Sequence, residues 1–126
     1  MSERRIVLKG RPQALKYNKS KSRLYVPKEV KKWQQDLGYI YKEQYKKIEN
    51  RKRIMLKIFA YIKGTDKQIL AGKGVARIPD LSNIVKAVEN SLEGVAYDND
   101  NQISCIVAQR ILVPSEEDER IEIEIS

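Results

Sequence analysis

Two short clusters of carboxylates and amides flank a helix-like stretch of this chain. The first lies within residues 77–86 and contains Asp80, and the second is the turn at residues 98–102, which contains Asp100. Hard oxygen ligands of this kind suit Mg²⁺ or Mn²⁺, which activate a water molecule and neutralise a phosphodiester. The chain has no histidine and one cysteine, which excludes Cys/His zinc sites and histidine-activated nucleophiles. Any catalysis therefore depends on carboxylates, lysines, hydroxyls or a metal that they hold.

The same residues also have a purely structural interpretation. Asp80 or Ser82 can cap the helix, whose first N–H groups need acceptors, and residues 98–101 can simply turn the chain. An EF-hand is excluded, because the positions that would need glycine and glutamate are Ile103 and Gln109. Metal binding and helix capping therefore remain competing interpretations of the sequence.

Strands and helices alternate around these clusters. Alternating or continuous apolar runs predict strands and three- to four-residue spacing predicts helices. The strands are expected at Arg5–Lys9, Ile54–Lys63, Ile103–Leu112 and Arg120–Ile125, and the helices from Lys28 to about Asn50 and from Leu81 to Glu93, where Gly94 follows. The order β-α-β-α-β-β predicts an α+β fold with a small mixed sheet of about four strands and two main helices.

The remaining segments complete a single expected domain of 126 residues. Residues 10–24 have no periodicity and are expected to be a mobile basic loop. Cys105 lies in an apolar run, which predicts a small buried side chain in a reducing compartment. No apolar run is long enough to span a bilayer and no secretion signal is visible, so we expect a cytoplasmic protein without a membrane partner.

Positive charge is concentrated in the first part of the chain. Residues 1–77 hold 22 Lys/Arg and 6 Asp/Glu, whereas residues 78–126 hold 3 and 11. Such an excess suits a phosphate backbone, although a solvated, solubilising surface is the simpler alternative. The residues expected to bind nucleic acid are Lys9, Arg11, Lys16, Lys19, Lys21, Arg23, Lys28, Lys73 and Arg77.

Four motifs occur in an order that resembles the RusA family of Holliday junction resolvases, which is common in prophages. They are Lys9-Gly10-Arg11-Pro12, Tyr25-Val26-Pro27-Lys28, Pro79-Asp80-Leu81-Ser82-Asn83-Ile84-Val85-Lys86-Ala87 and Asp98-Asn99-Asp100-Asn101-Gln102-Ile103. Each motif is weak alone, but together the motifs are specific, and the resemblance extends over most of the chain in the right order.

The resemblance implies a homodimer that binds four-way DNA junctions and nicks two strands symmetrically with Mg²⁺, for which Mn²⁺ can substitute. It implies that Asp80 and Asp100 are metal-binding carboxylates and that Lys86 contacts the scissile phosphate. Asp98, or Ser82 through a water molecule, is a further candidate ligand. A two-fold dimer is the economical way for a small chain with one site to make paired cuts.

Ser82 departs from the family pattern, which has an aspartate at this position. A hydroxyl carries no formal charge to offset a divalent ion, so metal affinity and turnover should fall. Three explanations of this serine remain open. The protein is a natural variant that uses another ligand, or it binds DNA and no longer cuts, or the serine was introduced by substitution. The alternatives to a nuclease are a non-catalytic module for branched DNA or RNA and a basic structural protein.

Overall fold

Four strands form one mixed sheet in the computed structural model, which describes residues 3–65 and 78–126. They are β1 (Arg4–Lys9), β4 (Ile54–Lys63), β5 (Ile103–Val113) and β6 (Arg120–Ile125). The order in the sheet is β1-β6-β4-β5, in which β6 is antiparallel to both of its neighbours and β5 is parallel to β4. The predicted α+β architecture is confirmed, and β5 lies at one edge of the sheet.

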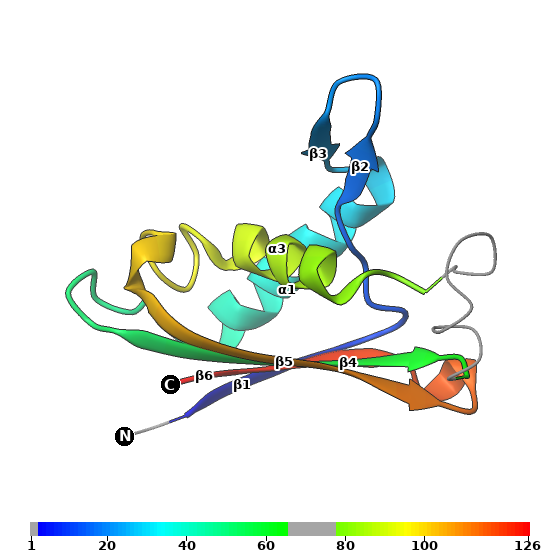
Figure 1. The fold of residues 1–126 in the computed structure, drawn as a ribbon. Coiled ribbons are helices and arrows are strands. Elements are labelled where there is room, and N and C mark those ends of the chain that lie inside the picture. Colours follow the sequence, from blue (N-terminus) through cyan, green and yellow to red (C-terminus); the bar gives the residue numbers. More distant parts are fainter. Residues whose placement is uncertain (1–2, 66–77) are drawn as a thin grey trace.

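Both helices pack on the same face of this sheet (Figure 1). They are α1 (Lys28–Gln44) and α3 (Leu81–Leu92). Each buries one apolar stripe, because residues three and four apart share a helix face. The buried residues are Val30, Trp33, Leu37 and Tyr41 in α1, as predicted, and Ile84, Ala87, Val88 and Leu92 in α3. In the described part of the chain, neither helix has the length and apolar character needed to cross a membrane.

The helix α1 ends six residues before the predicted end near Asn50. Tyr45 is already extended, with φ −140° and ψ 155°. The Tyr41 hydroxyl donates to the Lys46 carbonyl oxygen at 2.7 Å, which stabilises the chain as it leaves the helix. Ile48 is buried all the same, and its N–H donates to the Ala96 carbonyl at 2.8 Å. An apolar side chain at helical spacing therefore belongs here to a non-helical segment.

A short hairpin replaces the loop predicted at residues 10–24. Strands β2 (Lys16–Asn18) and β3 (Arg23–Tyr25) pair antiparallel, so the prediction of a stretch without regular structure is wrong for these strands. The Asn18 Oδ1 atom accepts hydrogen bonds from the Ser20 and Lys21 backbone N–H groups and thereby shapes the turn. Three-residue strands are too short to produce a periodic signal. The hairpin stands away from the sheet, on its helix-covered side (Figure 1).

The other face of the sheet is not covered by either helix (Figure 1). Cys105 lies on this face beside Met55 and is exposed, so its predicted burial is wrong. The reason is that neither helix covers this face, and that β5 has one strand neighbour among the described residues. Ile106 and Val107 on the same strand are 40% and 45% exposed. Within residues 3–65 and 78–126, the edge formed by β5 is therefore apolar and has no further strand beside it.

Candidate functional site

Asp80 begins α3 as its N-cap residue. Its Oδ1 atom accepts hydrogen bonds from the backbone N–H and the hydroxyl of Ser82, both at 2.9 Å. The neighbouring Pro79 carbonyl accepts a hydrogen bond from Arg110 Nη1 on β5 at 3.0 Å, which ties this end of the helix to the sheet. Asp80 therefore has the capping role that the sequence left open. The carboxylate remains exposed, so capping does not prevent it from meeting a cation.

Asp100 lies beyond the other end of α3, at the start of the short 3₁₀ helix η1 (Asp100–Gln102). The buried Gln102 side chain holds this turn in place. Its Oε1 atom accepts hydrogen bonds from the backbone N–H groups of Asp98 and Asn99 at 2.9 and 3.3 Å. Its Nε2 atom donates to the carbonyls of Glu49 and Lys52 at 2.9 and 3.2 Å, so one neutral amide joins two loops.

Carboxylates crowd together around Asp100. A hydrogen bond with Asp100, together with the negative charge of Asp100, raises the pKa of Glu93. Burial, and then the Asp100 charge, raises the pKa of Glu89, which Lys86 partly offsets. Burial followed by the charge of Asp100 likewise raises the pKa of the Tyr97 hydroxyl, which donates to the Glu89 carbonyl at 3.0 Å. Crowded carboxylates of this kind suit a hard divalent cation, which would relieve their repulsion.

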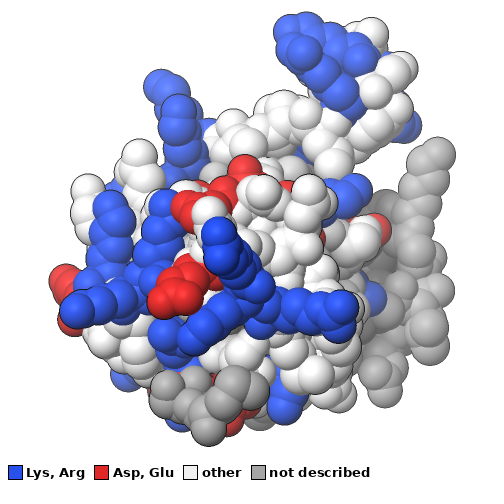
Figure 2. Space-filling model, turned by 90° about the vertical axis from the view of Figure 1, so that its left-hand side faces the viewer, with Lys and Arg blue, Asp and Glu red and all other residues white. Residues whose placement is uncertain are grey.

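Asp98, the further candidate ligand, has a different partner. Its carboxylate forms an ion pair with Lys47 at 2.5 Å, in the loop that follows α1. Figure 2 views the molecule from the side on which η1 lies, and acidic side chains occupy the middle of this face with lysines and arginines around them. The acidic residues therefore lie within a basic surface.

Three polar residues of α3 and its C-cap residue Glu93 form a ridge between Asp80 and Asp100. Spacing of three or four residues places Ser82, Lys86, Glu89 and Glu93 on one side of the helix, opposite its buried stripe. At 1.5 Å per residue the helix is about 18 Å long.

Within one chain, Asp80 and Asp100 lie at opposite ends of this helix, as Figure 1 shows from the positions of α3 and η1. Among residues 3–65 and 78–126, no group of three or more acidic, histidine or cysteine side chains is arranged to hold a metal ion. A single chain therefore supplies two parts of a candidate site that do not meet. Lys86 lies on the ridge between them and is exposed.

The hairpin carries four of the expected DNA-binding residues. Lys16, Lys19, Lys21 and Arg23 are all exposed, and Lys16 makes a loose ion pair with Glu29 at 3.7 Å. Lysines and arginines also cover the topmost part of the molecule in Figure 2, where the hairpin projects. Lys9 and Lys28 are exposed as well, whereas Lys73 and Arg77 lie outside the described residues.

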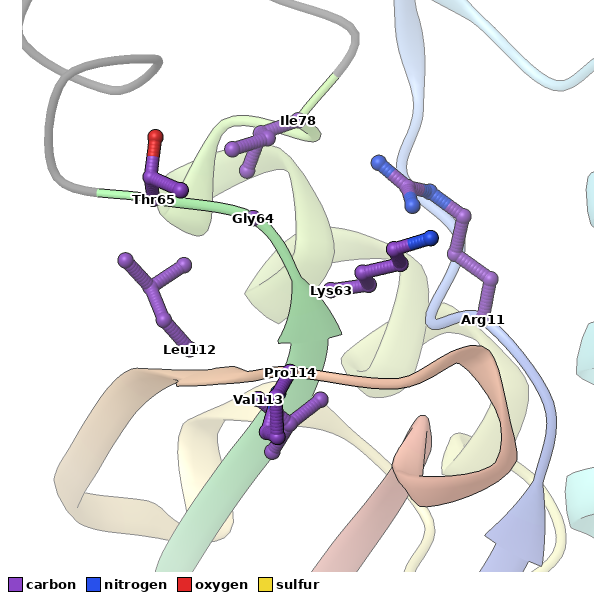
Figure 3. A pocket seen from close by; sticks show the side chains of 8 residues that line it. All are labelled: Arg11, Lys63, Gly64, Thr65, Ile78, Leu112, Val113 and Pro114. Atoms are coloured by element: carbon purple, nitrogen blue, oxygen red, sulfur yellow. The ribbon is translucent and has the colours of Figure 1, made fainter.

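Arg11 has a buried acidic partner, unlike the other expected DNA-binding residues that the structure describes. Its Nη1 atom lies 2.8 Å from Oε2 of the buried Glu119, which also accepts the Lys63 backbone N–H at 3.0 Å. Arg11 and Lys63 also line a hollow of about 860 Å³ near the ends of β4 and β5 (Figure 3). Arg11 therefore has a structural role, in addition to any contact with nucleic acid.

A second hollow joins the base of the hairpin to Asp80. It has a volume of about 490 Å³ and is lined by residues 11–16 and by Ile78, Pro79 and Asp80. The Leu15 N–H donates to the Asn83 carbonyl in the first turn of α3 at 3.3 Å. The basic hairpin is therefore anchored next to one of the two candidate metal ligands.

Sequence reasoning missed Glu89 and Glu93. Their spacing from Ser82 and Lys86 was visible in the sequence and marks a common helix face. Their proximity to Asp100 could not be predicted from the sequence, because it depends on how the chain returns after Gly94, whose φ is +83°.

Residues 5–126 match the family model for endodeoxyribonuclease RusA. The chain therefore belongs to the RusA endodeoxyribonuclease family, a family of metal-dependent nucleases for Holliday junctions. No curated protein gives a significant match to the chain.

Proposed function

We propose that this protein is a Mg²⁺-dependent endonuclease that binds four-way DNA junctions in the cytoplasm and nicks two strands as a homodimer, in DNA recombination and repair. The observation that carries the proposal is the separation of Asp80 and Asp100 along α3 in a chain that belongs to a nuclease family. One carboxylate is a poor site for a divalent ion, which needs several oxygen ligands. A second copy of the chain would supply the others.

The open edge of β5 is the surface we propose for this dimer. It is eleven residues long with one charged residue, Arg110, and an exposed apolar edge readily pairs with another strand. A two-fold axis through this edge would pair β5 with its copy in antiparallel orientation. Because α3 runs opposite to β5 above the same edge, the two α3 helices would then lie antiparallel.

An antiparallel pair of α3 helices would bring the two parts of the site together twice. Asp80 of one protomer would face Asp100 and Glu93 of the partner subunit, and the reverse would hold at the second site. Lys86 would face Glu89 of the partner subunit, a pairing of opposite charges near the axis. Two equivalent sites on one dimer would account for symmetric cutting of a junction.

The donor set fits the proposed metal, because it consists of exposed carboxylates whose mutual repulsion a cation would relieve. When bound, Mg²⁺ supplies a Lewis acid for the phosphodiester and a water molecule of lowered pKa. Asp80 and Asp100 would hold the ion, and Lys86 would contact the scissile phosphate from the ridge. The hairpin lysines would hold the DNA backbone and release its counterions.

Ser82 would weaken this site without removing it. Its hydroxyl already donates to Asp80 Oδ1, so it orients the carboxylate and lacks the charge that the family aspartate provides. We therefore expect an enzyme that requires a high metal concentration.

Mixing two inactive variants tests the shared site. Asp80→Asn and Asp100→Asn each inactivate both sites of their own dimers. After subunit exchange, a mixed dimer would keep one site with both aspartates, so about a quarter of the wild-type sites should return. These dimers should nick one strand of a synthetic junction without making the paired cut. A mixture of Asp80→Asn with Asp80→Ala is the matched control and should stay inactive.

A mixture as inactive as its two parents would show that both aspartates act within one chain and would overturn the shared site.

The second candidate function is a non-catalytic module for branched DNA or RNA, which the serine at position 82 favours. Wild-type protein that binds junctions but never nicks them in Mg²⁺ or Mn²⁺ would establish this module instead.

A further inference from the structure

Tyr17 is an exposed aromatic residue at the middle of strand β2. Its side chain is 56% exposed, although the hairpin around it is ordered by the Asn18 turn. Within residues 3–65 and 78–126, its ring makes no aromatic contact and its hydroxyl makes no hydrogen bond. A large apolar ring on a projecting hairpin costs free energy in water unless something covers it.

The pairing of the hairpin strands shows which way Tyr17 points. Tyr17 lies directly opposite Leu24, and directly paired residues of antiparallel strands project from the same face. Leu24 is half-buried and packs against the hydrophobic core. The face that carries Tyr17 is therefore the one turned toward the body of the protein. Tyr17 therefore lies on this inner face and is exposed, on the hairpin whose base lines the hollow with Asp80.

The charge around Tyr17 defines what can cover it. Lys16, Lys19, Lys21 and Arg23 belong to the same hairpin and its turn, and the described hairpin residues include no acidic side chain. A polyanion suits this surface, whereas an apolar peptide would have to approach through four positive charges. Aromatic rings on basic hairpins bind nucleic acids by stacking on bases that have left the helical stack.

We propose that Tyr17 stacks on an unstacked base at the branch point of the DNA substrate, while the lysines beside it hold the flanking phosphates. The inference rests on the proposed function and adds a residue that selects branched over linear DNA. A continuous duplex offers no free base face, whereas the strand exchange point does. Because the hairpin base lies beside Asp80, the stacked base would fix the distance between branch point and cut. Tyr17 is therefore a positioning residue that contacts DNA and takes no part in phosphodiester chemistry.

The test measures binding, without divalent metal, to a four-way junction that carries 2-aminopurine at the branch point and to a linear duplex of the same arm sequence. The proteins are wild type, Tyr17→Phe, Tyr17→Ala and the matched control Tyr39→Ala, whose tyrosine is 65% exposed on α1. Tyr17→Ala should weaken junction binding by about 10-fold and duplex binding by less than about twofold. Wild type and Tyr17→Phe should both change the 2-aminopurine fluorescence, and Tyr17→Ala should not.

Each other outcome overturns the inference in a recognisable way. A Tyr17→Ala protein with wild-type junction affinity and fluorescence change would remove Tyr17 from the interface and leave the proposed function intact. A Tyr17→Phe protein as weak as Tyr17→Ala would assign the effect to the hydroxyl rather than to stacking. Wild-type protein that does not prefer the junction to the duplex would contradict the proposed function itself. Equal losses on both DNAs would reduce Tyr17 to a general contact.

Discussion

The two ends of α3 carry the same kind of residue in opposite settings. At the first end, Asp80 uses its carboxylate to cap the helix and is exposed beside the basic hairpin. At the second end, Asp100 lies close to Glu93 and Glu89, and the Gln102 side chain holds the turn that carries Asp100. One end has a locally satisfied carboxylate, and the other has more negative charge than its surroundings neutralise.

This difference indicates that the two ends of the helix have different functions. The acidic end has the excess charge that would attract a cation, and the capped end has the neighbours that would hold DNA. Neither end is complete alone, and a rigid helix about 18 Å long keeps them apart. We therefore expect function to depend on the contact between two chains that brings opposite ends of their α3 helices together.

The largest expected effect comes from substitutions that prevent the β5 edge from pairing with a second copy of the chain. A double substitution, Ile106→Asp with Val107→Asp, places two charges on the proposed pairing edge while both aspartates stay in place. We expect a monomer whose junction nicking falls by more than about 100-fold, since the loss of an outer-shell partner alone costs about 10–100-fold. Sedimentation velocity and a nicking assay measure both effects. Met55→Asp, on the inner strand β4, is the control and should remain a dimer. A monomeric Ile106→Asp/Val107→Asp protein that still nicks junctions would show that one chain holds a complete site.

Gln102→Ala should have the next largest effect, on stability. It removes four hydrogen bonds from a buried site and leaves the carbonyls of Glu49 and Lys52 without their donor. We expect a loss of about 2–3 kcal/mol in the free energy of unfolding, measured by urea titration. Asn101→Ala, an exposed neighbour, should change it by less than about 0.5 kcal/mol. Equal effects of the two changes would mean that the turn does not depend on the amide.

Ser82→Asp should increase metal affinity, because it adds a negative charge at the Asp80 end of α3. The new carboxylate would restore the family pattern next to Asp80 and increase metal affinity. We expect half-maximal nicking at a Mg²⁺ concentration lower by about 10-fold, read from a metal titration of the nicking rate. Ser82→Ala should shift the titration in the opposite direction. An unchanged midpoint in Ser82→Asp would exclude position 82 from the metal site.

Glu93→Gln should have the smallest effect, confined to the acidic end. A hydrogen bond with Asp100 and its charge raise the pKa of Glu93, so the folded state holds this proton more tightly than the unfolded state. The associated stability is present below the unfolded pKa, about 4.3, and is lost as the pH rises through the folded pKa. Above that range the variant, which cannot ionise, should melt about 1–3 °C higher.

Differential scanning fluorimetry in metal-free buffer measures this shift, which should vanish near pH 3.5, where wild-type Glu93 is protonated and therefore uncharged like the glutamine of the variant. Glu43→Gln on the exposed face of α1 is the control and should not change the melting temperature at neutral pH. A melting temperature that falls in Glu93→Gln at pH 8 would mean that the carboxylate is stabilising.

The sequence predicted the elements with strong periodicity. Ile54–Lys63 and Arg120–Ile125 alternate along their length, and both strands have the predicted bounds. Two features could not be predicted, because they depend on tertiary contacts. Ile48 continues a helical pattern after the helix has ended, and the hairpin strands pair over three residues each.

The candidate site was predictable in composition but not in arrangement. Asp80, Lys86 and Asp100 were predicted as site residues from their motifs, whereas the separation of Asp80 and Asp100 in one chain follows from α3 and from the return of the chain after Gly94. The role of Arg11 was also hidden, because its partner Glu119 is more than 100 residues away in sequence. Contacts between distant segments leave no local pattern in residue types.

The amide of Gln102 has a consequence for how the protein would respond to ionic strength. Binding of the hairpin to DNA depends on charge and should weaken as salt increases. The Gln102 side chain is neutral and bonds to four backbone groups of the turn and its neighbouring loop, so salt should affect these contacts less than the exposed Asp98–Lys47 ion pair. Binding of DNA would therefore weaken as the salt concentration increases, whereas the hydrogen bonds of Gln102 that hold the Asp100 turn would change little.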